Sequence, residues 1–466
     1  MSRPRARYLA LLVLGVAASA AFGVERFPPP DFETGHVLPH AAQPAPLGAG
    51  YDYADAAVLL LTLAVATYLV LYRRSRRAIV GLCVFSVVYF GFWRRGCVCS
   101  IGSVQNVALA LFEPGYALPA AVALFFAAPI AFALFFGRVF CAGVCPMGAL
   151  QDLVLLKPLQ LPRWLDQGLG LLPYVYLGLA LLLAATGTSF IICQYDPFVP
   201  LFRMTGSMLM LGLGAGFLLV GTVVGRPYCR FLCPYGAVLG LAARVARKRV
   251  KVYPDVCVNC KLCEKSCPVN AIASPAPRPG PRELAAAKRR LAWALALWPV
   301  LIAVGVWTVG AAAPLLARAH PDVPLARLVA PDAAARFRGE PGLENDELTA
   351  FHKSGRSAQE VYASAQRVRS RFAIGSRILG AWIGLVLGAK LVGLARTPVR
   401  TDYQAQPGDC VACGRCFDYC PKEYERLGAV AGPTQGPVPV PAPALATLRV
   451  EARSTSGAAA GAGRKA

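Results

Sequence analysis

The chain has 466 residues, of which 56% are hydrophobic and 16% charged, and its mean hydropathy is +0.50. This composition is too apolar for an ordinary soluble enzyme. The formal net charge of +23 raises the question of nucleic acid as a partner. The basic residues, however, lie at the ends of apolar stretches and not in a patch interleaved with aromatic residues, which argues against nucleic-acid binding.

The N-terminal region has two interpretations. Residues 1–24 carry Arg3, Arg5 and Arg7 before an apolar run, so they form either a signal peptide with a small-residue site at Ala18-Ser19-Ala20 or a first transmembrane helix. The Pro-rich residues 25–52 are then a periplasmic linker.

Seven further apolar stretches predict membrane helices, since a bilayer core requires roughly 20 apolar residues. Five belong to a transmembrane bundle over residues 53–250, and the last two form a hairpin around a periplasmic loop at 314–371. The predicted fold is mainly α, a polytopic bundle of seven or eight spans. The stretches cover residues 56–72, 78–93, 117–137, 171–193, 207–225, 291–313 and 372–392.

Basic residues predict the orientation of these spans. If the spans alternate, the Lys and Arg clusters all fall on one face, which the positive-inside rule makes cytoplasmic. This predicts a multi-pass protein of the bacterial inner membrane. The clusters lie at 73–77, 244–251, 288–290 and 396–400.

A cysteine motif repeats three times within the bundle, each time directly after an apolar stretch and before a short helical segment. Two copies read Cys141-x3-Cys145-Pro146 and Cys229-x3-Cys233-Pro234 and fall at the cytoplasmic edge. A Cys pair four residues apart lies on one side of a helical turn, so the two pairs could complete a tetrahedral site for Fe–S or Zn. The alternatives are redox-active thiols or small buried hydrophobic residues.

The first copy, Cys97-x-Cys99, falls on the exported edge together with Cys193. Three thiols suit a disulfide with one thiol left over, or a metal site shared with another chain or ligand. Cys83 stands alone in an apolar stretch and is expected in the core. Three acidic residues near helix ends are expected to be solvated or to cap helices: Glu113, Asp152 and Asp196.

Two cysteine runs with identical spacing follow the bundle and the hairpin. They are Cys257-x2-Cys260-x2-Cys263-x3-Cys267-Pro268, within 252–274, and Cys410-x2-Cys413-x2-Cys416-x3-Cys420-Pro421, within 408–424. This is the bacterial ferredoxin spacing, in which the fourth Cys of a run ligates the other run's [4Fe–4S] cluster. Both runs fall on the predicted cytoplasmic face, where thiols stay reduced.

We expect the two runs to form one cytoplasmic ferredoxin-like α+β module with two [4Fe–4S] clusters. Lengthening the connecting loop from about 18 to about 142 residues costs only roughly 2 kcal/mol. Cys257, Cys260, Cys263 and Cys420 then hold one cluster, and Cys410, Cys413, Cys416 and Cys267 the other. The alternative is that each run ligates its own cluster with its own fourth Cys. Residues 430–466 are Pro/Ala/Gly-rich and predicted to be disordered.

Several cofactors are disfavoured by the sequence. All four His (His36, His40, His320, His352) lie in exported segments and no Cys-x-x-Cys-His occurs, so haem is not expected. No flavinylation signature of the form Ser/Thr-Gly-Ala-Thr/Ser occurs either, so flavin is not expected on this chain. A quinone site has no reliable signature here, and no catalytic residue is evident.

The paired Cys-x3-Cys-Pro motifs, the two ferredoxin runs and the segment Asp196-Pro197-Phe198 together resemble the NosR/NapH-type membrane polyferredoxins, over roughly residues 80–425. The resemblance implies a membrane electron-transfer subunit that supplies a periplasmic reductase or its maturation, often alongside a flavin-binding partner. We expect a conduit and not an enzyme, in which electrons enter at the ferredoxin module and leave near Cys97, Cys99 and Cys193 to a periplasmic protein, a separate flavoprotein or reductase, or exchange with quinone. A different function, metal (copper) reductase or chaperone in cofactor assembly, would require a soft exported site such as Cys97, Cys99 and Cys193.

Overall fold

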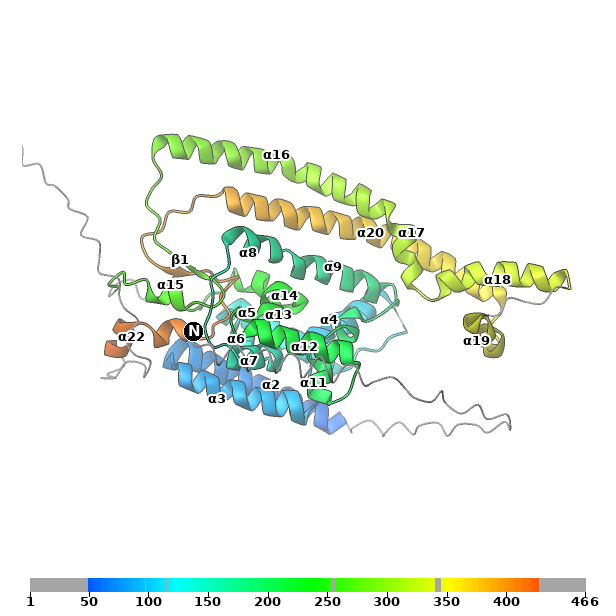
Figure 1. Cartoon of the computed structure of the whole chain (residues 1–466), viewed down its shortest axis with the longest axis horizontal. Coiled ribbons are helices and arrows are strands. Elements are labelled where there is room, and N and C mark those ends of the chain that lie inside the picture. Colours follow the sequence, from blue (N-terminus) through cyan, green and yellow to red (C-terminus); the bar gives the residue numbers. More distant parts are fainter. Residues whose placement is uncertain (1–48, 97, 114, 253–256, 340–344, 427–466) are drawn as a thin grey trace, which may run out of the picture.

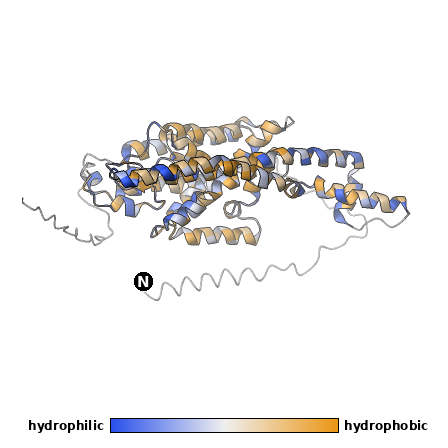
Figure 2. Cartoon of the chain, turned by 90° about the horizontal axis from the view of Figure 1, so that it is seen from above, coloured by the Kyte–Doolittle hydropathy of each residue, from blue (hydrophilic) through white to orange (hydrophobic). Residues whose placement is uncertain are grey.

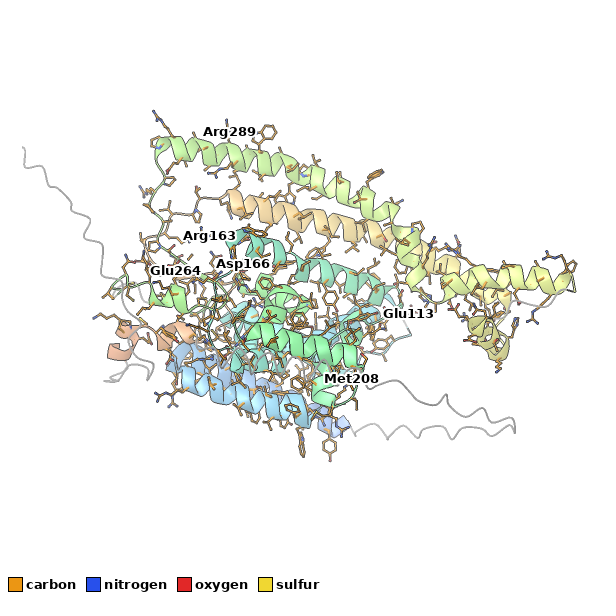
Figure 3. The ribbon with its side chains drawn as sticks, in the orientation of Figure 1. Glu113, Arg163, Asp166, Met208, Glu264 and Arg289 are labelled. Carbon is orange, nitrogen blue, oxygen red and sulfur yellow. The ribbon has the colours of Figure 1, made fainter. Side chains whose placement is uncertain are left out.

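The computed structural model describes residues 49–96, 98–113, 115–252, 257–339 and 345–426. Its described part is mainly helical and elongated (Figure 1). We call the end that carries both ferredoxin runs the ferredoxin end, and the end that carries α18 (Asp322–Phe337) and α19 (Asp346–Ser354) the far end. Charged residues mark both ends: Arg163, Asp166, Glu264 and Arg289 lie at the first, and Glu113 towards the second (Figure 3).

Five helices of the described part are long and apolar enough to cross a membrane. The first two are α2 (Ala49–Tyr68) continued by η2 (Leu69–Arg73), and α3 (Arg76–Ser86) continued by η3 (Val87–Trp93). The third is α9 (Leu172–Ala185), preceded by α8 (Arg163–Leu169). The last two are α16 (Pro281–Ala311) and α20 (Ala358–Ala395). Hydrophobic residues run along these long helices (Figure 2), and the Trp307 side chain on α16 is 75% exposed, as expected for a lipid-facing residue.

Two predicted spans are shorter than the sequence indicated. The stretch 117–137 forms α5 (Ala120–Phe136), which ends at Gly137 with φ +76°, and the stretch 207–225 forms α12 (Met208–Gly221). The stretch 171–193 also ends early, at Ala185, because Gly187 adopts a left-handed φ of +69° and Thr188 N turns back to donate to Leu183 O at 2.9 Å. Two more short apolar helices are α4 (Ser100–Phe112) and α14 (Pro234–Ala243). The chain is therefore a membrane-helix bundle in which the count of seven or eight spans remains a prediction.

The described part of the bundle also contains very short helices, three of which carry a cysteine. They are α6 (Val139–Gly143), α7 (Pro146–Leu153), α10 (Ile191–Gln194), α11 (Val199–Arg203) and α13 (Pro227–Phe231). Cys141, Cys193 and Cys229 lie in α6, α10 and α13, and Cys145 directly precedes α7. Figure 1 shows α6, α7 and α13 among the longer helices of the bundle.

The α16–α20 hairpin connects the two ferredoxin runs. Gly380, Gly384 and Gly388 of α20 face α16 so closely that a Cβ at any of them would collide with it, the small-residue packing common between membrane helices. At the far end the chain passes through α17 (Ala313–Leu316), η4 (Ala317–Ala319), α18 and α19. α20 then begins with a capping box in which Glu360 N donates to Ser357 Oγ at 3.3 Å.

A small module closes the ferredoxin end. Strands β1 (Ile272–Ala273) and β2 (Gln404–Ala405) pair antiparallel, with Ile272 opposite Ala405. Helices α15 (Leu262–Ser266), α21 (Arg415–Asp418) and α22 (Pro421–Arg426) lie beside them. The hairpin thus brings the two distant runs into one α+β unit.

Candidate metal centres

One group of thiols in the module mixes the two runs. Cys257, Cys260 and Cys263 line the same pocket as Cys420. Burial raises the pKa of Cys263 to about 11, and the neighbouring thiolates of Cys260, Cys420 and Cys257 raise this pKa as well. The fourth cysteine of the second run therefore lies beside the first three of the first run.

A second group is the reciprocal one. Burial raises the pKa of Cys416 well above its ordinary value, and the charges of Cys410, Cys413 and Cys267 add to the effect. Burial likewise raises the pKa of Cys410 to about 12, with Cys413 and Cys267 again nearby. Cys267 is buried among residues of the second run, and its Sγ accepts a hydrogen bond from Ala271 N at 3.3 Å.

Each of these two groups has the four thiols that a [4Fe–4S] cluster requires. Gathered thiols that repel one another's charge require a cation before all of them can ionise, and a bound iron core supplies that charge. Among the described residues, no three His, Cys, Asp or Glu side chains converge on one point where a single metal ion could be held. In a cubane each thiolate binds its own iron, so four thiols around a cluster need no common point.

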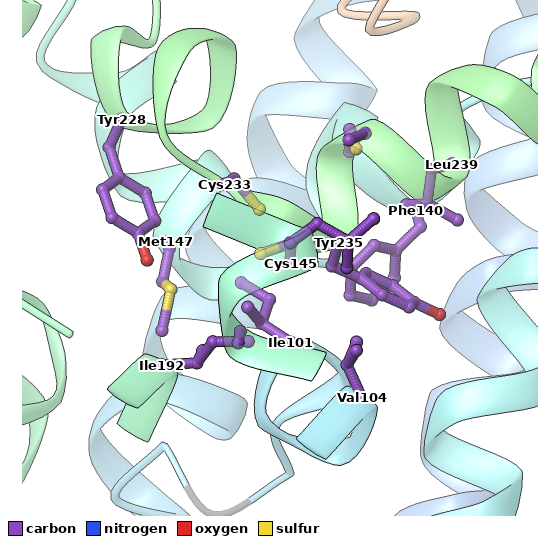
Figure 4. Packing of buried hydrophobic residues seen from close by; sticks show 14 of the residues in the cluster. Ile101, Val104, Phe140, Cys145, Met147, Ile192, Tyr228, Cys233, Tyr235 and Leu239 are labelled. Carbon is purple, nitrogen blue, oxygen red and sulfur yellow. The ribbon is translucent and has the colours of Figure 1, made fainter. Parts of the chain in front are cut away.

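The four thiols of the two Cys-x3-Cys-Pro motifs lie together in the bundle, and we call them the inner site. Each of the four is within electrostatic range of the other three, and Figure 4 shows the sulfurs of Cys145 and Cys233 pointing toward one another. Cys145 and Cys233 occupy the N-cap positions of α7 and α14. The Cys233 Sγ accepts a hydrogen bond from Gly236 N at 3.3 Å, which favours a negatively charged sulfur there.

Gln151 and two arginines surround the inner site. Gln151 donates from Nε2 to Cys229 Sγ at 3.3 Å and accepts from Tyr228 N at 3.1 Å. Arg226 is fully buried and donates to the carbonyls of Cys141 and Ala142. Arg138 donates to Gly408 O at 3.1 Å and lies close to the Cys141 thiol. Two buried cations therefore stand next to four thiols and compensate their negative charge.

Asp152 connects the inner site to the ferredoxin module. Its carboxylate pairs with Arg76 at 2.6 Å, Arg226 at 3.4 Å and Arg415 at 3.9 Å. Arg76 also donates to Cys413 O at 2.9 Å. The expectation that Asp152 is solvated or caps a helix was wrong, because its side chain is 0% exposed and lies among three arginines.

At the other end of the inner site lie Cys99 and Cys193. Cys99 is within electrostatic range of both Cys145 and Cys193. A Cβ at Gly102 would lie 2.9 Å from Cys193 Sγ and 3.6 Å from Cys99 Sγ, so the two sulfurs face the same glycine. Cys97, the third thiol predicted here, lies outside the described residues. Cys83 is fully buried in the core, as expected.

The sequence did not reveal Arg138, Arg226 or the role of Gln151. A single buried arginine leaves no pattern in a chain with 48 Lys and Arg. Gln151 did carry a signal, since Gln105 occupies the equivalent place in the first copy of the cysteine motif.

Parts of the chain match a known family of iron–sulfur domains. A family profile described as a 4Fe-4S binding domain matches residues 118–164 and 206–253, and another of the same description matches 250–273. These segments contain both pairs of inner-site cysteines and the first ferredoxin run. An uncharacterized protein of Methanocaldococcus jannaschii, MJ0750, is 30% identical over 191 residues, 39% of this chain and 77% of the relative. The chain belongs to the NosR/NapH-type family of membrane polyferredoxins.

Two other relatives of this polyferredoxin have descriptive names. The "putative electron transport protein YccM" of Escherichia coli is 28% identical over 166 residues, 32% of this chain and 46% of the relative. The "regulatory protein NosR" of Pseudomonas aeruginosa is 27% identical over 278 residues, 53% of this chain and 38% of the relative. The chain thus spans less than half the length of these two relatives. No solved structure matches the polyferredoxin.

Proposed function

We propose that this polyferredoxin moves electrons across the bacterial inner membrane, between a cytoplasmic or quinone donor and a periplasmic redox partner. The observation that supports this most is the order of the cysteine groups. They run from the two ferredoxin groups, through the inner site, to Cys99 and Cys193. Such a row of thiol sites along a membrane bundle suits one-electron carriage better than catalysis, which is why we assign the chain no catalytic residue.

The grouping of the thiols supports an assignment of the ligands. Cys257, Cys260, Cys263 and Cys420 hold one [4Fe–4S] cluster, and Cys410, Cys413, Cys416 and Cys267 hold the other. When bound, these clusters supply one-electron redox chemistry whose potential depends on charge, hydrogen bonds and solvent exposure. The chain contributes burial, backbone N–H donors such as Ala271 N, and a nearby cation in Arg138.

Contacts between the module and the bundle support transfer into the inner site. Arg76 and Arg415 attach the second run to Asp152, while Arg138 connects Gly408 to the region of Cys141. Arg226 is near both Cys413 and Cys229. The inner-site thiols Cys141, Cys145, Cys229 and Cys233 then provide the next redox centre, either a further Fe–S cluster or reactive thiols.

The orientation with the ferredoxin end in the cytoplasm rests on the basic clusters found there and on the positive-inside rule. A periplasmic flavoprotein or reductase would then meet the far end. A cavity of about 1540 Å³ between the bundle and the hairpin borders Cys229, Arg138 and Trp382. Its mixed apolar and basic walls suit a quinone as the alternative exchange partner.

The first test is metal analysis of the full chain purified anaerobically. We expect broad visible absorbance and about eight irons or more per chain, because each of two cubanes carries four. A colourless preparation with fewer than about four irons contradicts the proposal.

The second test separates the two ligand patterns. Cys420→Ala is expected to lose the EPR signal of the cluster held by Cys257, Cys260 and Cys263, and Cys267→Ala the signal of the other cluster. Cys83→Ala, which removes a buried thiol outside both groups, serves as the control and keeps both signals. If Cys420→Ala removes only the signal of the Cys410–Cys416 cluster, each run ligates its own cluster.

A further inference from the structure

The cysteine motif places its thiol in the same local geometry in all three copies. Cys99, Cys145 and Cys233 are the N-cap residues of α4, α7 and α14. A glycine follows three residues later in each copy, and its backbone N–H lies close to the thiol. Gly102 N donates to Cys99 Sγ at 3.2 Å, just as Gly236 N donates to Cys233 Sγ at 3.3 Å. The first copy therefore has the local structure of an inner-site copy.

In two copies of the cysteine motif, a glutamine bonds to a backbone N–H that directly precedes a cysteine on another helix. At the inner site, Gln151 Oε1 accepts from Tyr228 N at 3.1 Å, and Gln151 Nε2 donates to the sulfur of the next residue, Cys229. In the first copy, Gln105 Oε1 accepts from Ile192 N at 2.9 Å, and the residue after Ile192 is Cys193. Cys193 is thus the counterpart of Cys229.

The side-chain amide nitrogen of Gln105 makes no hydrogen bond in the described structure. Gln105 is 0% exposed, and its Nε2 is a buried donor without a hydrogen-bond partner among the described residues. A buried unpartnered amide costs free energy unless a group is present to accept from it. The equivalent nitrogen of Gln151 donates to the sulfur of Cys229. By analogy, the acceptor that suits Gln105 Nε2 is a sulfur or another acceptor atom held beside Cys193.

Cys233, the remaining thiol of the inner site, also has a counterpart in the first copy, which is Asp196. Cys233-Pro234 follows Cys229 after three residues, and Asp196-Pro197 follows Cys193 after two. Asp196 is 2% exposed, accepts from Phe198 N at 2.8 Å, and lies within electrostatic range of both Cys99 and Cys193. Among the described residues, no Lys or Arg forms an ion pair with Asp196. The backbone donor at Phe198 offsets part of the cost of burying this carboxylate beside two thiols, and a bound metal would offset more of it.

We infer that Cys99, Cys193 and Asp196 hold an iron–sulfur centre, the outer site, in which Asp196 is a carboxylate ligand and Gln105 donates to the bound centre. The outer site is a second copy of the inner site, turned toward the far end. The inference rests on the proposed function, because iron–sulfur occupancy follows from the redox role. Thiolates alone would also suit zinc or Cu(I).

The experiment uses the full chain, purified anaerobically, with iron, sulfide, zinc and copper measured per chain and EPR recorded after dithionite reduction. Asp196→Ala and Cys193→Ala are each expected to lose the same share of iron and sulfide and the same EPR signal. The signals of the ferredoxin clusters stay unchanged and show that the variants are folded. Cys83→Ala is the matched control and loses nothing.

Asp196→Cys recreates the Cys-Pro pair of the inner site. It is expected to retain the iron and sulfide but to shift the reduction potential of one centre to more negative values, since a thiolate donates more charge than a carboxylate. A variant spectrum identical to that of the unmodified protein would overturn the role of Asp196.

The remaining outcomes separate the two proposals. If the ferredoxin signals are present but Asp196→Ala and Cys193→Ala lose no iron, the outer site is wrong while the proposed function stands. If these variants instead lose zinc or copper, the site binds a metal ion and the iron–sulfur inference is overturned. If the unmodified protein lacks iron altogether, the proposed function fails.

Discussion

The inner and outer sites share a local architecture but differ in charge. At the inner site, four thiols lie beside the buried guanidinium groups of Arg138 and Arg226. At the outer site, two described thiols lie beside the buried carboxylate of Asp196, and Arg203 is a cation within electrostatic range of Cys193. The same backbone motif thus occurs in two different electrostatic environments. Under the proposed function, the side chains around the cysteines, and not the motif itself, would set the reduction potential of each site.

The largest effect is expected from removing an inner thiol. Cys229→Ala deletes the sulfur that Gln151 contacts, so the inner centre should be lost completely, whereas Cys193→Ala should remove only the outer one. Iron and sulfide analysis with EPR distinguishes the two losses. If Cys229→Ala and Cys193→Ala remove the same signal, the inner and outer sites are one site.

The second effect is on stability. Asp152 is fully buried among Arg76, Arg226 and Arg415, so Asp152→Asn leaves buried guanidinium groups uncompensated and should cost about 3–5 kcal/mol. Asp196→Asn removes no ion pair of the described structure and should cost less. Thermal unfolding in detergent, followed by the loss of ferredoxin EPR signals, measures both. Equal unfolding temperatures for the two variants would show that Asp152 does not anchor the module.

A smaller effect is expected on the reduction potential of the centre at the inner site. A buried positive charge stabilises the reduced, more negative state, and one such charge is worth roughly 1–4 kcal/mol at this range. Arg138→Met should therefore lower the reduction potential of the inner centre by roughly 40–170 mV. Arg138→Lys keeps the positive charge and should retain most of the original potential. Redox titration monitored by EPR gives the value. An unchanged potential in Arg138→Met would mean that its charge is screened from the site.

The smallest effect concerns the two glutamines. Gln151→Leu removes a neutral hydrogen bond to Cys229 Sγ, worth about 0.5–1.5 kcal/mol, so the inner potential should fall by roughly 20–60 mV. Gln105→Leu should produce a shift of similar size at the outer centre if its Nε2 donates there. No shift in Gln105→Leu, with a shift in Gln151→Leu, would separate the two sites in function.

Much of the ferredoxin module could be predicted because its signal is local. The spacing of each run and the short reach of a cluster leave few ways to place the thiols, and the structure brings Cys420 beside Cys257–Cys263 and Cys267 beside Cys410–Cys416. The pairing of Ile272 with Ala405 was not predictable. Two-residue strands have no periodicity, and they pair because the α16–α20 hairpin returns the chain to the same end.

The surroundings of the inner site could not be predicted, for a different reason. The partners of Asp152 come from residues 76, 226 and 415, and no local pattern relates such distant positions. The basic cluster at 73–77 was assigned to topology alone, yet Arg74 and Arg76 turn inward and pair with Glu423 and Asp152. Helix ends were also missed at Ala185 and Gly221, since hydropathy continues past the residues that terminate those helices.

The most direct measurement is an anaerobic redox titration of the full chain followed by EPR, with iron and sulfide determined on the same sample. The account predicts two [4Fe–4S] signals that Cys420→Ala and Cys267→Ala remove separately, with about eight irons accounting for them. A protein that binds no iron, or one in which both substitutions leave both signals intact, would contradict it.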